Sequence, residues 1–154
     1  MALLVAQNIA HFGFSLLILS ILFNSLFSSE IITNLKVGET FEDLNTKIIS
    51  KSIEQKEEKN FKSIIANFNI ENSKGIIENL SPELRIYNQP NIVTSEADIK
   101  TTMMSDKFIV INVVQNQDYF NVRYQVKPFM LWIWLSVLLI SFGGLLSLFK
   151  KNYE

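Results

Sequence analysis

The chain contains a single histidine, His11, which lies within an apolar stretch near the N-terminus. Gln7, Asn8 and Ser15 lie three or four positions away, so in a helix they share one face with His11. A polar or ionisable side chain inside a membrane span is expensive and is expected to face protein, ligand or water instead of lipid. This polar face therefore predicts either hydrogen bonds to another helix or a metal-binding site.

Haem ligation is the metal chemistry that this face could perform. A neutral imidazole is a good axial ligand for haem iron, and an acceptor such as Gln7 or Ser15 could hold the other ring nitrogen and fix the tautomer. One histidine supplies only one ligand, so a bis-histidine site requires a second segment or subunit. Met103, Met104 and Met130 are conceivable sulfur donors, although no pattern in the sequence supports them.

The elements that must position His11 follow from the distribution of charge. No Asp, Glu, Lys or Arg occurs in residues 1–29 or in residues 128–149, and both stretches are strongly apolar. Each reaches the roughly 20 residues that a helix needs to cross a hydrocarbon core of about 30 Å. We therefore predict transmembrane helices at residues 1–28 and 128–149, followed by a cytoplasmic tail at residues 150–154.

The orientation of the two spans is predicted from their flanks. Lys150 and Lys151 directly follow the second span, which favours a cytoplasmic C-terminus by the positive-inside rule and, with two spans, a cytoplasmic N-terminus. Trp132 and Trp134 then lie near the outer interface, or simply face lipid. The first span could instead be a cleaved signal sequence, but it lacks the basic residues of such signals, so a retained helix is favoured.

Residues 29–127 are predicted to form a β-rich domain on the outer side of the membrane. Alternating or β-branched runs bounded by turn formers predict short strands, whose spacing is typical of an antiparallel sandwich or a small barrel. We expect hairpin turns at residues 72–75 and 115–118, a bend at residues 88–91, and a polar loop or hairpin tip at residues 54–62. The predicted strands cover residues 47–53, 61–70, 75–80, 107–114 and 119–126.

Charge and motif content exclude several functional classes. The chain has 15 acidic and 14 basic residues, so a phosphate-binding surface and a nucleic-acid partner are not expected. It has no cysteine, which excludes a thiol nucleophile, a disulfide and a cysteine-ligated zinc or iron–sulfur site from this chain. No GxGxxG, P-loop, HExxH or GxSxG pattern occurs, and we assign no catalytic residue.

Short segments spread over nearly the whole chain resemble the C-terminal part of the CcmF family, a group of cytochrome c-type biogenesis proteins that includes NrfE and CcsA-like members. This family is the membrane subunit of the bacterial and mitochondrial cytochrome c haem lyase. The order and spacing of the segments make the resemblance specific. They are Ala10-His11-Phe12-Gly13, Lys36-Val37-Gly38-Glu39, Ser81-Pro82-Glu83-Leu84-Arg85-Ile86-Tyr87, Thr94-Ser95-Glu96-Ala97-Asp98-Ile99, and Lys127-Pro128-Phe129-Met130-Leu131-Trp132-Ile133-Trp134 followed by Gly143-Gly144.

The resemblance implies a role in cytochrome c maturation. In this family, haem arrives from a periplasmic haem chaperone, and its vinyl groups are joined as thioethers to the cysteines of a CxxCH motif in apocytochrome c. The family also holds a haem b inside the membrane, ligated by histidines on two helices, and His11 matches one of these ligands. The implied cofactor is therefore haem b, with the second ligand and most of the site outside this chain.

The resemblance also shows what this chain lacks. The family's tryptophan-rich segment, its external histidines and its other membrane histidine lie upstream of the part represented here, so we expect a fragment or a split-gene product that is not catalytic alone. The implied partners are the remaining lyase segments, the haem chaperone and apocytochrome c, in a bacterial or mitochondrial inner membrane. The alternative is a non-catalytic scaffold that docks partner proteins. We interpret Arg85 and Tyr87 as residues that hold the outer domain together.

Overall fold

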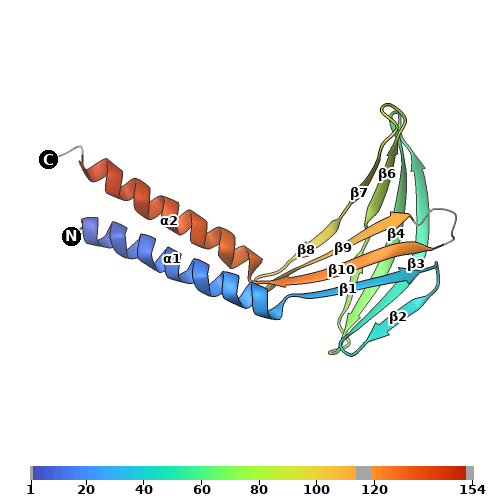
Figure 1. The fold of residues 1–154 in the computed structure, drawn as a ribbon, viewed down its shortest axis with the longest axis horizontal. Coiled ribbons are helices and arrows are strands. Elements are labelled where there is room, and N and C mark those ends of the chain that lie inside the picture. Colours follow the sequence, from blue (N-terminus) through green and yellow to red (C-terminus); the bar gives the residue numbers. More distant parts are fainter. Residues whose placement is uncertain (1, 114–118, 152–154) are drawn as a thin grey trace. The chain divides into compact units, whose positions relative to one another are not determined.

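The computed structural model describes residues 2–113 and 119–151, in which two long helices flank a series of strands (Figure 1). The helices are α1 (Ala2–Phe27) and α2 (Met130–Lys151). The predicted turn at residues 115–118 lies outside the described residues. The strands are β1 (Ser29–Leu35), β2 (Thr40–Asp43), β3 (Thr46–Glu57), β4 (Phe61–Asn72), β5 (Ile77–Leu80), β6 (Glu83–Tyr87), β7 (Val93–Glu96), β8 (Asp98–Thr101), β9 (Ser105–Val113) and β10 (Phe120–Pro128).

The chain divides into two compact units. The helical unit consists of Met1–Ser29, Thr101–Asp106 and Val126–Glu154, so it contains α1, α2 and the turn between β8 and β9. The sandwich unit consists of Glu30–Lys100 and Lys107–Gln125.

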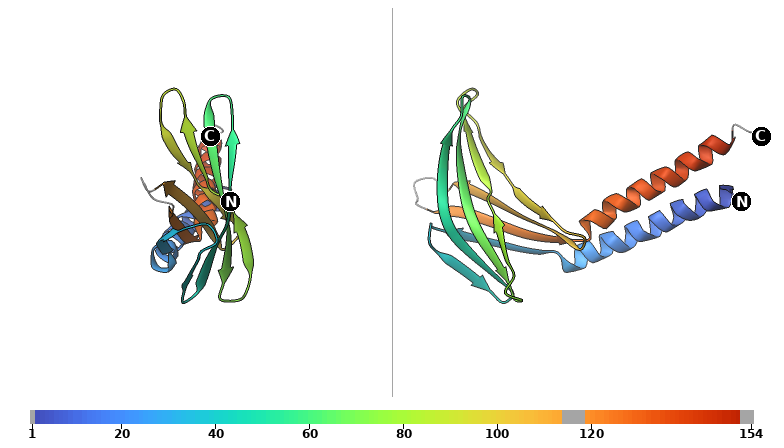
Figure 2. Two further views of the ribbon diagram at one scale, coloured as in Figure 1. Left: turned by 90° about the vertical axis from the view of Figure 1, so that its right-hand side faces the viewer. Right: turned by 180° about the vertical axis from the view of Figure 1, so that it is seen from behind.

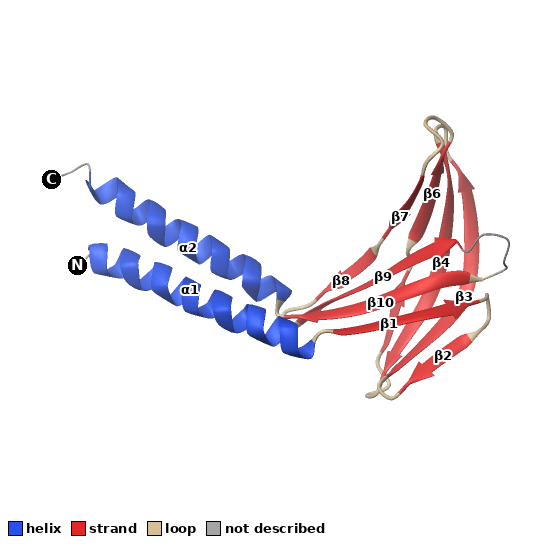
Figure 3. Cartoon of the chain, in the orientation of Figure 1, coloured by secondary structure: helices blue, strands red, loops and turns tan. Residues whose placement is uncertain are grey.

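The sandwich unit is built from two sheets, which Figure 3 distinguishes from the helices by colour. One sheet has the strand order β1-β10-β9-β8, and the other has the order β2-β3-β4-β6-β7, with β5 also paired to β4. The two longest strands, β3 and β4, form a curved antiparallel hairpin (Figure 2). The predicted antiparallel β-sandwich flanked by two apolar helices is confirmed.

Period-2 alternation in the strands produces the core of the sandwich. Ala66, Phe68 and Ile70 alternate along β4 and are 1%, 2% and 3% exposed. Ile109 and Ile111 alternate along β9 and are fully buried. Burying each such large aliphatic or aromatic side chain stabilises the fold by about 1.5–3 kcal/mol.

The five predicted strands are present, but one predicted loop is largely strand. The polar stretch 54–62 belongs to β3 as far as Glu57 and to β4 from Phe61, so only residues 58–60 form the hairpin tip. The predicted turn at residues 72–75 is present, because Asn72 Oδ1 accepts hydrogen bonds from the N–H groups of Lys74 and Ile76 at 2.9 and 3.0 Å. A bend occurs at residues 88–90, as predicted.

The two helices lie side by side (Figure 1) and approach closely at small residues. A Cβ atom added to Gly143 of α2 would lie 2.8 Å from the main-chain oxygen of Ala6 and 2.8 Å from the nitrogen of Ala10 in α1. A Cβ atom added to Gly13 would lie 3.0 Å from Ile140. Close main-chain approach at small residues is a common way for apolar helices to associate.

The junction between β10 and α2 is held against the end of α1. The side-chain amide of Asn24 donates a hydrogen bond to the carbonyl of Pro128 at 2.6 Å, and the rings of Phe23 and Phe129 are 5.2 Å apart. Phe129 has a φ of 60°, in the left-handed region that non-glycine residues rarely adopt. The end of α1 and the start of α2 are therefore neighbours.

Both helices are long and apolar enough to cross a membrane. The qualifying segments are Leu4–Phe27 and Met130–Leu148, judged by length and composition.

The glycine contact predicts the effect of a methyl group on helix pairing. Gly143→Ala should destabilise the helical unit by about 1–3 kcal/mol, because the new Cβ atom meets main-chain atoms that cannot rotate away. Gly144→Ala is the matched control, since a Cβ atom there has no neighbour within 4 Å. Thermal unfolding followed by circular dichroism in detergent measures both variants. Equal melting temperatures would contradict this packing.

Candidate functional site

The environment of His11 defines one end of the candidate site. His11 lies in α1 with an exposed side chain, and its Nδ1 atom lies 2.7 Å from the main-chain carbonyl oxygen of Gln7. A carbonyl can only accept a hydrogen bond, so Nδ1 carries the proton. The lone pair is then on Nε2, the nitrogen that points away from the helix backbone. This is the tautomer in which a histidine can bind a metal through Nε2.

The other polar residues of this face have different roles from those predicted. Gln7 contacts the imidazole through its main-chain carbonyl and not through its side chain. The hydroxyl of Ser15 donates a hydrogen bond to the main-chain carbonyl of His11 at 3.0 Å, so it does not hold a ring nitrogen. Only the Gln7 carbonyl fixes the tautomer, and such a contact requires no particular side chain at position 7.

The polar face is directed away from α2. Gln7, Asn8, His11 and Ser15 are all exposed, whereas the residues that α1 buries are small side chains on another face, namely Ala6, Gly13 and Ser20. The polar face is thus available to a segment outside this chain, either for hydrogen bonding or for a shared ligand.

The methionines considered as sulfur donors lie at the opposite end of the helical unit. Met130 begins α2, beside the end of α1 at Asn24. Asn24 is 13 residues beyond His11, which corresponds to roughly 20 Å along a helix. Met103 and Met104 are bound to the first turn of α2 and share this separation. None of these methionines can ligate a metal ion held by His11 in this arrangement.

No metal-binding cluster of three or more His, Cys, Asp or Glu side chains occurs among residues 2–113 and 119–151.

Arg85 and Tyr87 belong to a network on one face of the second sheet. The Arg85 guanidinium makes two hydrogen bonds to the Glu83 carboxylate, both at 3.0 Å, and the Ser63 hydroxyl donates a third at 2.7 Å. Arg85 also lies 5.4 Å from the centre of the Phe61 ring, which packs against Tyr87. The hydrogen bonds from Arg85, followed by that from Ser63, lower the pKa of Glu83. This network joins β4 and β6 and offers no free nucleophile or base.

A second ion cluster lies deeper in the sandwich. The Glu78 carboxylate, 11% exposed, lies 2.7 Å from Lys107 Nζ and 3.7 Å from Lys100 Nζ. Burial, together with the negative charge of Glu78, raises the pKa of Tyr124 to about 12. Sequence spacing gives no signal for the ion pair between Glu78 and Lys107, because the two residues are 29 positions apart on different strands.

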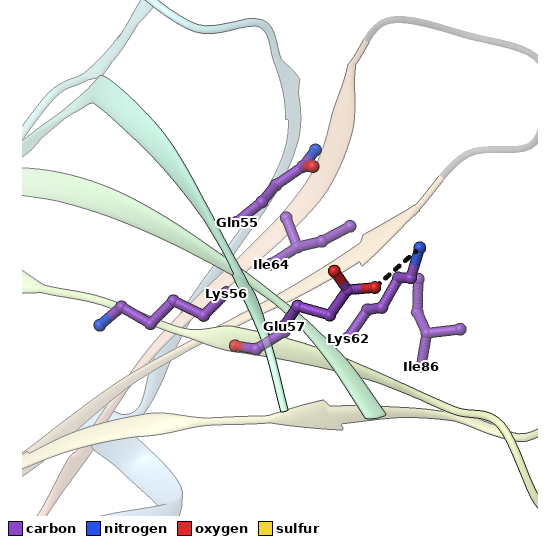
Figure 4. Close-up of a pocket in the computed structure, with 7 residues that line it drawn as sticks. Gln55, Lys56, Glu57, Lys62, Ile64 and Ile86 are labelled. Carbon is purple, nitrogen blue, oxygen red and sulfur yellow. Dashed lines mark ion pairs between the residues drawn. The ribbon is translucent and has the colours of Figure 1, made fainter. Parts of the chain in front are cut away.

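An open pocket of about 460 Å³ lies near the β3–β4 tip (Figure 4). Glu57 and Lys62 point toward one another in an ion pair of 3.4 Å, while Lys56 points away (Figure 4). Both members of the pair are well exposed, with side chains 77% and 62% accessible. The pocket is a solvated hollow with an apolar floor at Ile64 and Ile86, and its groups do not converge on a reacting position.

The sequence of this chain matches a known protein family and two curated relatives. Residues 26–128 match the family described as CcmF C-terminal beta-sandwich. The cytochrome c-type biogenesis protein ccl1 of Rhodobacter capsulatus is 36% identical over 119 residues, covering 77% of this chain and 18% of that protein. The cytochrome c-type biogenesis protein CcmF of Pseudomonas fluorescens is 30% identical over 148 residues, covering 96% of this chain and 22% of that protein.

A solved structure, "Cytochrome c Heme Lyase CcmF", has the same fold. It aligns with a TM-score of 0.72 at 18% identity and covers 94% of this chain and 24% of the other. The chain thus spans about a fifth of the length of the curated relatives it matches.

The Glu83 network predicts an acid-dependent stability. Because its pKa is lowered in the folded state, the Glu83 carboxylate stabilises the fold above the unfolded-state pKa of about 4.3, and this stabilisation is lost as pH falls through the lower folded-state pKa. Glu83→Gln should therefore unfold more easily than the wild type at pH 7, and the difference should shrink as pH falls below the unfolded-state pKa of about 4.3 and vanish below the lowered folded-state pKa. Denaturant unfolding followed by circular dichroism measures this difference.

Glu57→Gln is the control for the Glu83 experiment. Its carboxylate pairs only with the exposed Lys62 across 3.4 Å, so its removal should leave stability unchanged. A Glu83→Gln difference that does not shrink as pH falls below about 4.3 would contradict the assignment of the effect to the carboxylate charge.

Proposed function

The chain belongs to the CcmF C-terminal beta-sandwich family, and from this premise we propose that it is the C-terminal component of a cytochrome c haem lyase. In this role it contributes to haem delivery and covalent attachment to apocytochrome c. The observation that carries the proposal is the family match to the sandwich, together with relatives named as cytochrome c-type biogenesis proteins. Because the chain spans about a fifth of those relatives, the role is that of one part of a larger catalyst.

His11 is the residue through which this chain would hold a haem b. The Gln7 carbonyl ties down Nδ1–H at 2.7 Å and leaves Nε2 as an outward-directed ligand, which supports axial ligation of iron. A bound haem would supply one-electron redox chemistry. The part of this chain would be to orient one axial nitrogen and to fix the tautomer of the imidazole.

The second axial ligand and most of the haem pocket would come from outside this chain. The polar face of α1 is directed away from α2 and is exposed, which is the arrangement that a shared site requires. The proposed partners are the remaining lyase segments, the haem chaperone and apocytochrome c. The same exposed face would equally serve a scaffold that only bonds to another helix, and this alternative is separated from haem ligation by the His11 experiment below.

The proposed location is a bacterial or mitochondrial inner membrane, with α1 and α2 as spans at residues 1–28 and 128–149. Residues 29–127 would lie on the periplasmic or intermembrane side, and residues 150–154 would be cytoplasmic. The length and apolar character of Leu4–Phe27 and Met130–Leu148 support two crossings.

Reporter fusions test this topology. Alkaline phosphatase fused after Asn60 should be active, because the hairpin tip would lie outside the cytoplasm, and the same enzyme fused after Glu154 should be inactive. Fusions of green fluorescent protein at the two positions provide the reciprocal control, since they fluoresce only in the cytoplasm. The reverse pattern of activities would refute the topology.

Haem content tests His11 as a ligand. In the assembled complex, His11→Ala should remove most of the b-type absorbance, because Gln7, Asn8 and Ser15 are poor ligands for haem iron. Added imidazole should restore part of the absorbance by occupying the vacant coordination position. Ser15→Ala is the matched control, because it removes a hydroxyl from the same face and leaves the imidazole in place.

The scaffold alternative predicts a different result in this experiment. If His11 only bonds another helix, His11→Ala should cost on the order of 0.6–2 kcal/mol of helix association and leave the haem content unchanged. Equal b-type absorbance in wild type and variant, at equal protein in the membrane, would end the ligand assignment.

A further inference from the structure

The turn between β8 and β9 presents two adjacent methionines at its tip. Thr102 N–H donates to the carbonyl of Ser105 at 3.0 Å, and the Thr102 hydroxyl donates to the same carbonyl at 2.8 Å. These bonds close a tight turn around Met103 and Met104, which are 67% and 62% exposed. The tip therefore displays two flexible apolar side chains. They remain largely exposed among the described residues.

Two hydrogen bonds hold this turn to the beginning of α2. The Trp132 indole N–H donates to the carbonyl of Met103 at 2.9 Å, and the Phe129 N–H donates to the carbonyl of Met104 at 2.9 Å. Both bonds lie within the helical unit, which includes Thr101–Asp106. The methionine tip is consequently level with the first turn of the helix.

We propose that the Met103–Met104 tip inserts into the boundary between the lipid headgroups and the acyl chains. This inference rests on the proposed crossing of the membrane by α2. If the apolar span begins at Met130, a tip tied to Phe129 and Trp132 lies at the membrane surface. Exposed apolar side chains at this level bury themselves about 5–10 Å into the interface.

The surroundings of the tip favour lipid as its occupant. The carbonyls of the exposed methionines are bonded to the beginning of the span, where Trp134 is 63% exposed and Leu131 is 42% exposed. Tryptophan at the end of a span is characteristic of the membrane interface. No charged residue occurs between Lys100 and Asp106, so insertion of the tip desolvates no charge. The tip would act as a third point of membrane contact beside the two helices.

Site-specific fluorescence quenching tests the proposal. The chain has no cysteine, so Met103→Cys in the full chain carries a single environment-sensitive label without background. The protein is reconstituted in phosphatidylcholine–phosphatidylglycerol vesicles that contain nitroxide lipids labelled either at the headgroup or deep in the acyl chain, and iodide is the quencher in water. Circular dichroism confirms that the labelled variants retain the wild-type secondary structure.

Two further cysteine variants provide matched controls. Leu138→Cys reports on the span itself, because Leu138 is a 66% exposed residue of α2. Leu44→Cys reports on an exposed apolar residue of the sandwich, since Leu44 in the β2–β3 turn is 94% exposed. The Leu138 label should be quenched most by the deep nitroxide, and the Leu44 label only by iodide.

The proposal expects the Met103 label to be quenched more by headgroup nitroxide than by deep nitroxide, and to be shielded from iodide. Quenching by iodide alone would place the tip in water and overturn the inference, while Leu138 still reported a span. Shielding from all three quenchers would show that protein covers the tip, which also overturns it. If the Leu138 label were not quenched by lipid, the proposed membrane crossing would fail and the tip insertion with it.

Discussion

The close main-chain approach of α1 and α2 constrains the helical unit of this chain. Gly143 brings the two helix backbones so near that a single added carbon would collide with Ala6 and Ala10. Asn24 of α1 donates to the carbonyl of Pro128, so the end of α1 and the start of α2 are neighbours. Within the sandwich, β1 and β10, the first and last strands, pair in one sheet, and Glu30 accepts hydrogen bonds from Arg123 and Gln125 across that pair.

The sandwich is stabilised without disulfides by its apolar core and by two partly buried ion networks. One network joins Glu83 to Arg85 and Ser63 on neighbouring strands, and the other joins Glu78 to Lys107 and Lys100 across the two sheets. Partly buried charges of this kind cost desolvation energy, which their hydrogen bonds and ion pairs offset. Removing one partner would leave a charge in a poorly solvated position.

The sequence predicts the helices and the sandwich well because both follow from local patterns. The charge-free ends match α1 and α2, and the alternating runs match the five strands that include the core residues Phe68 and Ile109. The sequence analysis misses β1, β2, β6, β7 and β8, which are short or carry mixed polar residues whose pairing depends on neighbours distant in sequence. The Glu78–Lys107 pair is missed for the same reason.

At His11, spacing identifies the polar face, but the hydrogen bond that fixes the imidazole is to a main-chain carbonyl, which leaves no signature in residue types.

The tight contact at Gly143 also limits how far α1 can rotate against α2 at the turn that carries His11. Gly143 contacts Ala10, the residue directly before His11, so the contact and the proposed ligand occupy the same turn of α1. A slip of one residue in the register of the two helices would rotate the imidazole by about 100° and move it by about 1.5 Å along the axis. The ring cannot compensate freely, because its Nδ1–H is tied to its own helix. The close approach of Gly143 to α1 therefore fixes the helix register on which the direction of the proposed ligand depends.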